Sequence, residues 1–275
     1  MPLQLAVGFA LAALIGYAGY RRRALSKSGV AGAILTGGII FGFGGLSGAA
    51  LLLVFFISSS ALSRFKESQK ESLAEKFSKG SQRDMGQALA NGGLAALCIL
   101  GWAFTHHPAW WAAFAAALAA ANADTWATEL GVLNPNPPRL VTNGRIVEVG
   151  TSGAISLFGT AAALAGSLLI AFTALVVIPL DPSLSLLRTH TPILPYLIAL
   201  SGLFASLFDS LLGATAQSIF YCDQCQKETE RHPLHRCGAM TRPLRGWRWL
   251  DNDWVNFLAT AVGAALAAGF FLTGR

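Results

Sequence analysis

Long apolar stretches alternate with short polar connections along almost the whole chain. Eight stretches are predicted as helices, at about residues 3–20, 28–42, 47–62, 86–104, 109–130, 151–178, 193–220 and 254–272. At a rise of about 1.5 Å per residue, each is long enough, or nearly so, to cross the hydrocarbon core of a bilayer. The pattern predicts an all-α, polytopic membrane protein in which residues 1–275 form a single integral-membrane domain.

The composition agrees with this interpretation. Only 12% of the residues are charged and 53% are hydrophobic, whereas ordinary soluble domains have about 25% charged residues. So few charges cannot cover the surface of a soluble protein of this size. A soluble enzyme, a disordered chain and a disulfide scaffold are therefore excluded, and we expect an integral protein of a bacterial inner membrane or its equivalent, thylakoids included.

The basic residues favour a particular number of spans. The glycine-rich region 28–62 is compatible with one over-long helix, a re-entrant pair or two spans. With two spans there, and eight in total, 18 of the 20 Lys and Arg residues fall in connections on one side of the membrane. By the positive-inside rule that side is cytoplasmic, and both termini lie on the other side. The net charge of +6 is then explained by lipid headgroups rather than by nucleic acid.

Polar side chains lie along one face of each of five predicted helices. Because ionisable groups are costly in hydrocarbon, such residues face protein, water or a ligand. One polar stripe is explained by helix packing alone, but five stripes at one depth predict a polar cavity open to the cytoplasm. The candidate residues are Arg83 and Asn91; Asn122, Asp124, Thr125 and Glu129; Thr151 and Ser152; Asp209 and Gln217; and Asp253 and Asn256.

The residue types in these stripes are suited to phosphate chemistry. Asp124, Glu129 and Asp209 offer the oxygen ligands that Mg²⁺ prefers. The turn at 150–153 is either an anion site at a helix N-terminus or simply a tight turn into the helix. Basic residues in the facing loops could clamp phosphates: Arg83, Arg139, Arg145 and Arg242. Together these groups indicate metal-assisted phosphoryl transfer, although no Walker A or kinase loop motif is present.

Three cysteines gather in the predicted cytoplasmic loop 221–253. Cys222, Cys225, His235 and Cys237 have the spacing of a structural zinc knuckle, with His232 as an alternative fourth ligand. The same spacing is compatible with free or redox-active thiols. A site with four protein ligands leaves no open position, so a bound zinc ion would brace the loop rather than catalyse.

Several motifs resemble an integral-membrane family that includes plant phytyl-phosphate kinase. They are ANADTWATELG at 121–131, VGTSGAIS at 149–156, DSLLGATAQ at 209–217, the YCDQC and HRCG segments at 221–238, and LDNDWVN at 250–256. The resemblance implies a CTP-dependent kinase that converts an isoprenyl monophosphate, such as phytyl phosphate, to the diphosphate. The expected partners are then a lipid phosphate, a nucleoside triphosphate and membrane lipids.

Within this hypothesis the residues take distinct roles. Asp124, Glu129 and Asp209 are the expected catalytic and Mg²⁺-binding groups. The expected substrate and nucleotide contacts are Arg83, Asn91, Asn122, Thr125, Arg145, Thr151, Ser152, Gln217, Asp253 and Asn256.

Other activities fit the same layout. A cytidylyltransferase or a polyprenol kinase would use the same groups. A transporter would need a polar path on both sides of mid-membrane. The outer helix halves consist almost entirely of Ala, Leu, Phe and Trp, which argues against a transporter.

Overall fold

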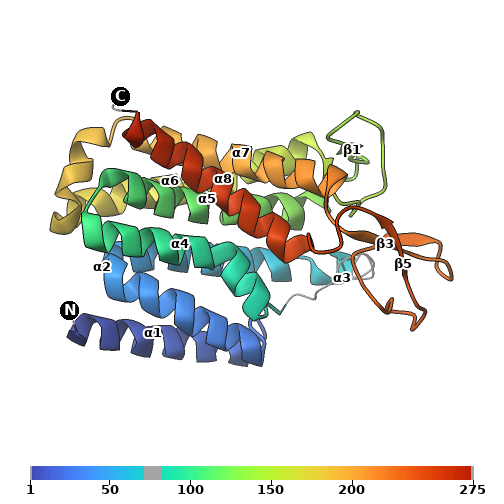
Figure 1. Cartoon of the computed structure of the whole chain (residues 1–275), viewed down its shortest axis with the longest axis horizontal. Coiled ribbons are helices and arrows are strands. Elements are labelled where there is room, and N and C mark those ends of the chain that lie inside the picture. The colour runs from blue at the N-terminus through green and yellow to red at the C-terminus, as the bar shows by residue number, and fades with distance from the viewer. Residues whose placement is uncertain (1, 71–81, 274–275) are drawn as a thin grey trace.

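The computed structural model describes residues 2–70 and 82–273 and shows a helical bundle with irregular loops gathered at one end (Figure 1). Both chain termini lie at the opposite end of the bundle. The helices are α1 (Pro2–Arg21), α2 (Lys27–Arg64), α3 (Glu67–Lys70), α4 (Met85–Thr105), α5 (Pro108–Gly131), α6 (Leu157–Leu180), the 3₁₀ helix η2 (Pro182–His190), α7 (Leu194–Thr215) and α8 (Asn252–Leu272).

The loops contain two small antiparallel sheets, so the fold is mostly but not entirely helical. One sheet pairs β1 (Arg139–Leu140) with β2 (Ala154–Ile155). The other has the order β4-β3-β5, formed by β3 (Ile219–Cys222), β4 (Lys227–Thr229) and β5 (Arg242–Arg245). The paired strands provide hydrogen bonds for backbone N–H and C=O groups that lie outside the helices.

Six helices of the described residues are long and apolar enough to cross a membrane: α1, α2, α4, α6, α7 and α8. Helix α5 is not among them, yet it is the most enclosed helix of the bundle. It is buried from Trp111 to Ala123 and packs against α2, α4, α6, α7 and α8. Its alanines allow these neighbours to approach closely. At Gly202 of α7, for example, an added Cβ would lie 2.9 Å from the backbone carbon of Ala119.

Helix α2 consists of two antiparallel segments joined at Gly45. This glycine has φ 58° and ψ −152°, a conformation essentially restricted to glycine. Gly37 and Leu52 lie on either side of this glycine, and a Cβ on Gly37 would lie 3.8 Å from Cδ2 of Leu52. In a straight helix these two residues would be about 22 Å apart. The reversal agrees with the prediction of two segments in 28–62. The total of eight spans, and the membrane side of the termini, stay predictions.

Four of the helices that start at the loop end begin with a side-chain cap. Ser26, Asp84, Ser156 and Asp251 each accept a hydrogen bond from a backbone N–H in the first turn of α2, α4, α6 and α8. Asp84 and Gln87 form a reciprocal capping box. These caps fix where each helix begins and therefore where its first polar side chains lie.

Because Gly45 lies in a region that other residues avoid, Gly45→Ala should destabilise the protein by about 1–3 kcal/mol. The free energy of unfolding, measured by SDS titration in mixed micelles, checks this. Gly269→Ala is the matched control, since Gly269 is helical and has open space around it. Equal stability of the two variants would show that the reversal does not depend on glycine at position 45.

Candidate functional site

A polar cavity of about 700 Å³ opens among the helices at the loop end of the bundle. The described residues that line this cavity come from all the long helices except α1, and from α3 and the loops. Its polar and charged lining residues are Ser63, Glu67, Lys70, Arg83, Gln87, Asn91, Asp124, Thr125, Thr128, Glu129, Thr151, Ser152, Ser156, Thr160, Ser206, Asp209, Ser210, Gln217, Glu230, Arg231, Arg236, Asn252 and Asn256. The position is the one that the polar stripes predict.

Two carboxylates from different helices lie within this cavity. Asp124 comes from the fifth turn of α5 and Asp209 from the second half of α7. Their charges are close enough to interact, and Glu230 also acts on Asp209. Oδ2 of Asp209 is buried, and no group in the described part of the chain donates a hydrogen bond to it. An orphaned carboxylate oxygen beside a second carboxylate is a donor set that fits a divalent cation.

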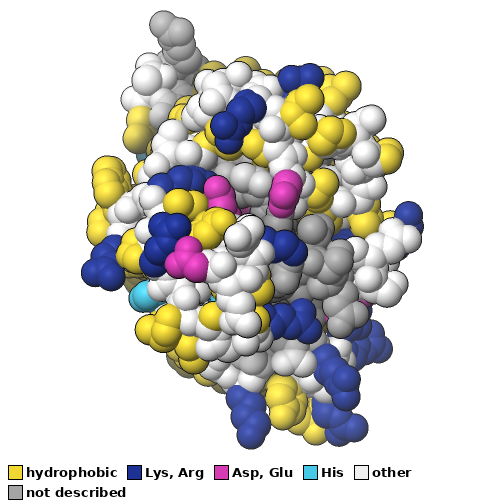
Figure 2. Space-filling view, turned by 90° about the vertical axis from the view of Figure 1, so that its right-hand side faces the viewer, with side chains coloured by type: hydrophobic (Ala, Val, Ile, Leu, Met, Phe, Trp, Pro, Cys, Tyr) yellow, Lys and Arg dark blue, Asp and Glu magenta, His cyan; other side chains and the backbone are white. Residues whose placement is uncertain are grey.

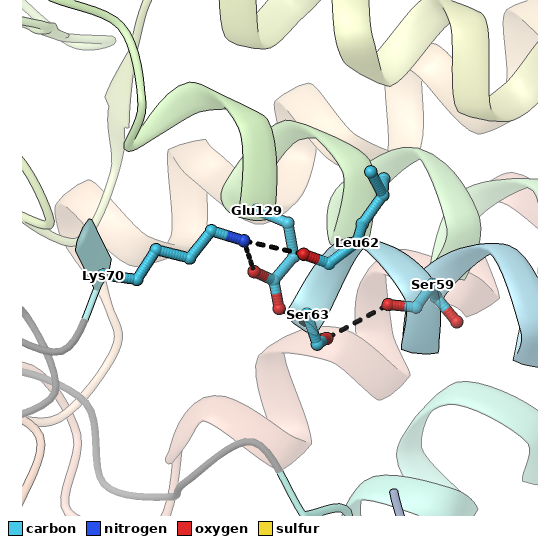
Figure 3. A network of polar contacts seen from close by, with 5 residues as sticks. All are labelled: Ser59, Leu62, Ser63, Lys70 and Glu129. Carbon is cyan, nitrogen blue, oxygen red and sulfur yellow. Dashed lines mark hydrogen bonds and ion pairs between the residues drawn. The ribbon is translucent and has the colours of Figure 1, made fainter. Parts of the chain in front are cut away.

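Glu129, one turn further along α5, is already held by its neighbours. Lys70 Nζ lies 2.6 Å from one carboxylate oxygen, and the Ser63 hydroxyl donates to the other, also at 2.6 Å (Figure 3). Lys70 also donates to the carbonyl of Leu62. Glu129 thus ties α3 to α2 and presents Lys70 to the cavity. Sequence patterns did not identify Lys70, because its partner is 59 residues away.

Arg83 lies at the cavity wall just before α4. Its guanidinium packs over the Phe55 ring, 5.3 Å from the ring centre. Burial lowers the pKa of Arg83 to about 10, although the nearby charge of Glu129 opposes this shift. Arg83 therefore keeps its positive charge at neutral pH. Its backbone pairs with Ala24 and Ser26, which links this position to the turn between α1 and α2.

The glycine-containing turn at 150–153 is not a helix N-terminus, which corrects the predicted anion site there. Helix α6 begins at Leu157, after strand β2 and the Ser156 cap. The turn instead packs tightly on α7, where a Cβ on Gly153 would overlap the backbone of Ala214. Thr151 and Ser152 still line the cavity. The Ser152 hydroxyl donates to Gln217, whose amide donates to Glu230.

Three predicted site residues lie outside the described cavity lining: Asn122, Arg145 and Asp253. Asn122 is completely buried, donates to the carbonyl of Gly166 at 2.8 Å and accepts a hydrogen bond from Ser58. Arg145 is exposed in the β1–β2 loop. Asp253 lies in the first turn of α8. Of these, Asn122 holds α5 to α2 and α6.

The other loop arginines also differ from expectation. Arg139 is exposed and donates to the carbonyl of Gly144, and Arg242 pairs with Asp223 at 3.0 Å, so neither lines the cavity. Arg231 and Arg236, between β4 and β5, line it instead. Seen from the loop end, Lys and Arg side chains are spread over this face of the molecule (Figure 2). The only sequence signal for Arg236 was its position between His235 and Cys237.

Cys222, Cys225, His235 and Cys237 come together in the loop that carries these two arginines. Their ligand atoms all lie within 4.8 Å of one another. The sulfurs of Cys222 and Cys237 are 3.7 Å apart, close to the edge of about 3.8 Å that a tetrahedron with metal–sulfur bonds of about 2.3 Å requires. A hydrogen bond with His235 lowers the pKa of Cys237 to about 6, which favours the thiolate. The group could hold a metal ion.

His232, the alternative ligand, is engaged elsewhere. Its ring stacks on Phe220 with a centroid separation of 4.3 Å, and its Nδ1 lies 3.2 Å from the Thr241 hydroxyl. His235 is therefore the fourth member of the cluster. Its Nε2 is buried, and the described residues offer this atom no hydrogen bond.

Because Asn122 satisfies a buried carbonyl on another helix, Asn122→Ala should lower the free energy of unfolding by about 1–2 kcal/mol. Thr173→Ala is the control, since the Thr173 hydroxyl bonds only within its own helix. Unfolding of the two variants in the same detergent checks the difference. If Asn122→Ala were as stable as the control, the interhelical role of Asn122 would be wrong.

Comparison with known proteins assigns the chain to a protein family. The model of the family described as "Integral membrane protein DUF92" matches residues 10–264. Protein PGR of Arabidopsis thaliana is 32% identical over 94% of this chain and 93% of its own length. An uncharacterized membrane protein of Methanocaldococcus jannaschii is 30% identical over 92% of this chain and 88% of its own length.

A second Arabidopsis protein, "Protein VTE6, chloroplastic", is 28% identical over 88% of this chain and 64% of its own length. No solved structure matches the chain. The family match covers nearly all of the helices that build the cavity. The chain is therefore an integral membrane protein of the DUF92 family.

Proposed function

We propose that this protein is a membrane kinase that transfers a phosphoryl group from a nucleoside triphosphate to an isoprenyl monophosphate, giving the diphosphate. The observation that supports this most directly is the polar cavity, which combines the carboxylates of Asp124 and Asp209 with the cations of Lys70, Arg83, Arg231 and Arg236. Phosphoryl transfer depends mainly on positioning and on neutralising phosphate charge. CTP as donor and phytyl phosphate as acceptor follow from the family resemblance.

The roles of the two carboxylates follow from their surroundings. Asp124 and Asp209 would hold Mg²⁺, because both line the cavity and Asp209 has a buried oxygen to which no described residue donates a hydrogen bond. When bound, the ion supplies neutralisation of phosphate charge. Glu129 is assigned a positioning role, since Ser63 and Lys70 engage both of its oxygens.

The cationic side chains act on the phosphates themselves. Arg83 and Lys70 would contact the acceptor phosphate, whereas Arg231 and Arg236 reach the cavity from the loop side, where a soluble nucleotide arrives. An oxygen of the acceptor phosphate attacks the γ-phosphorus of the nucleotide, and the bond from that phosphorus to the β-phosphate oxygen breaks. The nucleoside diphosphate leaves with that electron pair. Because the acceptor phosphate is already ionised, no strong general base is needed.

Zinc is proposed as the ion of the Cys₃His cluster. Such a site is structural, since its four ligands leave no open position. Its ligands bracket the segment that carries Arg231 and Arg236. Zinc would therefore hold these arginines over the cavity.

Asp124→Asn should reduce the rate of phosphoryl transfer at least about a hundredfold, because the amide removes a charge without changing the shape of the side chain. Glu228→Gln, an exposed change on β4, should keep activity. The assay incubates purified protein with Mg²⁺, labelled CTP or ATP, and geranylgeranyl or phytyl phosphate, and measures labelled lipid diphosphate.

The products separate the alternatives. A kinase releases CDP from CTP, whereas a cytidylyltransferase releases pyrophosphate, and a polyprenol kinase acts on the free alcohol instead. Full activity of Asp124→Asn removes this residue from the mechanism. No transfer from either nucleotide to any prenyl phosphate overturns the kinase proposal.

The zinc proposal predicts about one zinc ion per chain in protein purified without chelator. Cys225→Ser should lose this ion, and Cys98→Ser, a buried change in α4 remote from the cluster, should keep it. Elemental analysis by mass spectrometry measures the metal, and limited proteolysis of loop 221–253 measures its order. Equal metal content in both variants would overturn the assignment.

A further inference from the structure

A second, apolar pocket adjoins the polar cavity and shares three of its wall residues. This pocket of about 70 Å³ lies between α1, both segments of α2, and α4. Arg83, Gln87 and Asn91 line both spaces. Apart from Thr36, its other wall residues are aliphatic, aromatic or glycine, among them Ala33, Leu53, Phe55 and Gly92.

The few polar side chains in this pocket do not present polar groups to a ligand. The Thr36 hydroxyl donates to the carbonyl of Gly32 and is therefore satisfied within its own helix. The Asn91 amide donates to the carbonyl of Gln87, and the Gln87 side chain closes the capping box of α4. The pocket is therefore suited to a hydrocarbon chain.

The boundary between the two spaces is the Arg83 side chain. Its guanidinium lies over the Phe55 ring, which belongs to the apolar pocket, and its charge interacts with that of Glu129, which lines the polar cavity. A ligand that satisfies both spaces must carry an anionic group at Arg83 and a hydrocarbon chain directly attached to it. A nucleotide or an inorganic phosphate has no such chain.

The pocket also runs in the direction that a membrane lipid requires. Its wall on α2 extends from Ala33 to Phe41, which is about 12 Å along a helix. Phe41 lies one turn before the reversal at Gly45, far from the loop end. The pocket therefore runs from the phosphate-binding end into the apolar part of the bundle.

We infer that this pocket is the binding site for the isoprenoid chain next to the phosphate, with Arg83 holding the phosphate at the junction. The inference rests on the proposed function for the identity of the chain, and it adds the location. The volume accommodates only the part of the chain nearest the phosphate, so the rest continues along the helices. The acceptor thus approaches from the α1–α4 side and the nucleotide from the loop 221–253 side.

Two adjacent glycines of α4 offer a matched pair of variants. Gly92 lines the pocket, and a Cβ there would lie 3.6 Å from the Thr36 side chain, which is ordinary contact. Gly93 lies outside the pocket lining, and its Cβ would meet only Leu89 of its own helix, at 3.9 Å. Gly92→Leu therefore fills the pocket, whereas Gly93→Leu adds the same atoms elsewhere on the same helix.

The test uses geranylgeranyl phosphate with a photoreactive diazirine in its first isoprene unit, applied to the full-length protein in lipid nanodiscs. Mass spectrometry should locate the label within residues 33–56 of α2 and 88–92 of α4. Gly92→Leu should reduce labelling by about tenfold and raise KM for the prenyl phosphate similarly, with KM for the nucleotide unchanged. Gly93→Leu should change neither.

The outcomes distinguish this inference from the proposed function. Specific labelling without any phosphoryl transfer supports the pocket and overturns the kinase. Transfer with the label on α6, α7 or α8 supports the kinase and overturns the pocket. Mapping on the unmodified protein decides the location even if Gly92→Leu does not fold.

Discussion

The enclosure of α5 is the constraint on which the rest of the structure depends. A helix surrounded by five others cannot carry large side chains on every face, and α5 is accordingly alanine-rich where it is buried. Its neighbours come close enough that even a single Cβ at Gly202 would collide with it. Because the position of α5 is fixed so tightly, its last two turns carry Asp124 and Glu129 to one defined place. Helix α5 is not among the described helices that are apolar enough to cross a membrane, although it is the centre of the bundle, because polar residues such as Asn122, Asp124 and Glu129 lower its mean hydropathy.

The features that depend on periodicity were predictable from the sequence. Apolar stretches gave the helices, and polar stripes correctly located the cavity that contains Asp124 and Asp209. What depends on the neighbours was not predictable. Asn122 and Asp124 are two residues apart on one helix, yet Asn122 meets the carbonyl of Gly166 and Asp124 meets the cavity. Lys70, Arg231 and Arg236 come from loops whose course no helical period describes. The turn at 150–153 was wrongly predicted to be a helix N-terminus, because strand β2 and the Ser156 cap separate it from α6.

Among the described lining residues, the Lys and Arg side chains lie toward the loop end, together with Glu67 and Glu230, whereas the deepest charged groups are carboxylates. Asp124 and Asp209 come from the bodies of α5 and α7, whereas Lys70, Arg231 and Arg236 belong to the loop-end segments. The deep carboxylates repel each other and attract a cation, and the outer cations attract phosphates. A divalent cation held by the carboxylates, together with a phosphate held by the outer cations, would balance both sets of charges. This arrangement explains why Glu129, one turn nearer the loops than Asp124, is already paired with Lys70.

The first two turns of α4 separate the polar cavity from the apolar pocket, and their geometry has to be rigid for that purpose. The Asp84–Gln87 capping box and the backbone pairing of Arg83 with Ala24 and Ser26 fix the start of this segment. A flexible arginine here would turn into the aqueous cavity, where its charge is better solvated, and the junction would lose its anion site. Since Arg83 is instead held over the Phe55 ring, its charge stays at the boundary between the cavity and the pocket, both of which it lines. Arg83 therefore lies where the polar cavity meets the apolar pocket, which is where the anionic group and the hydrocarbon chain of an amphiphilic ligand would join.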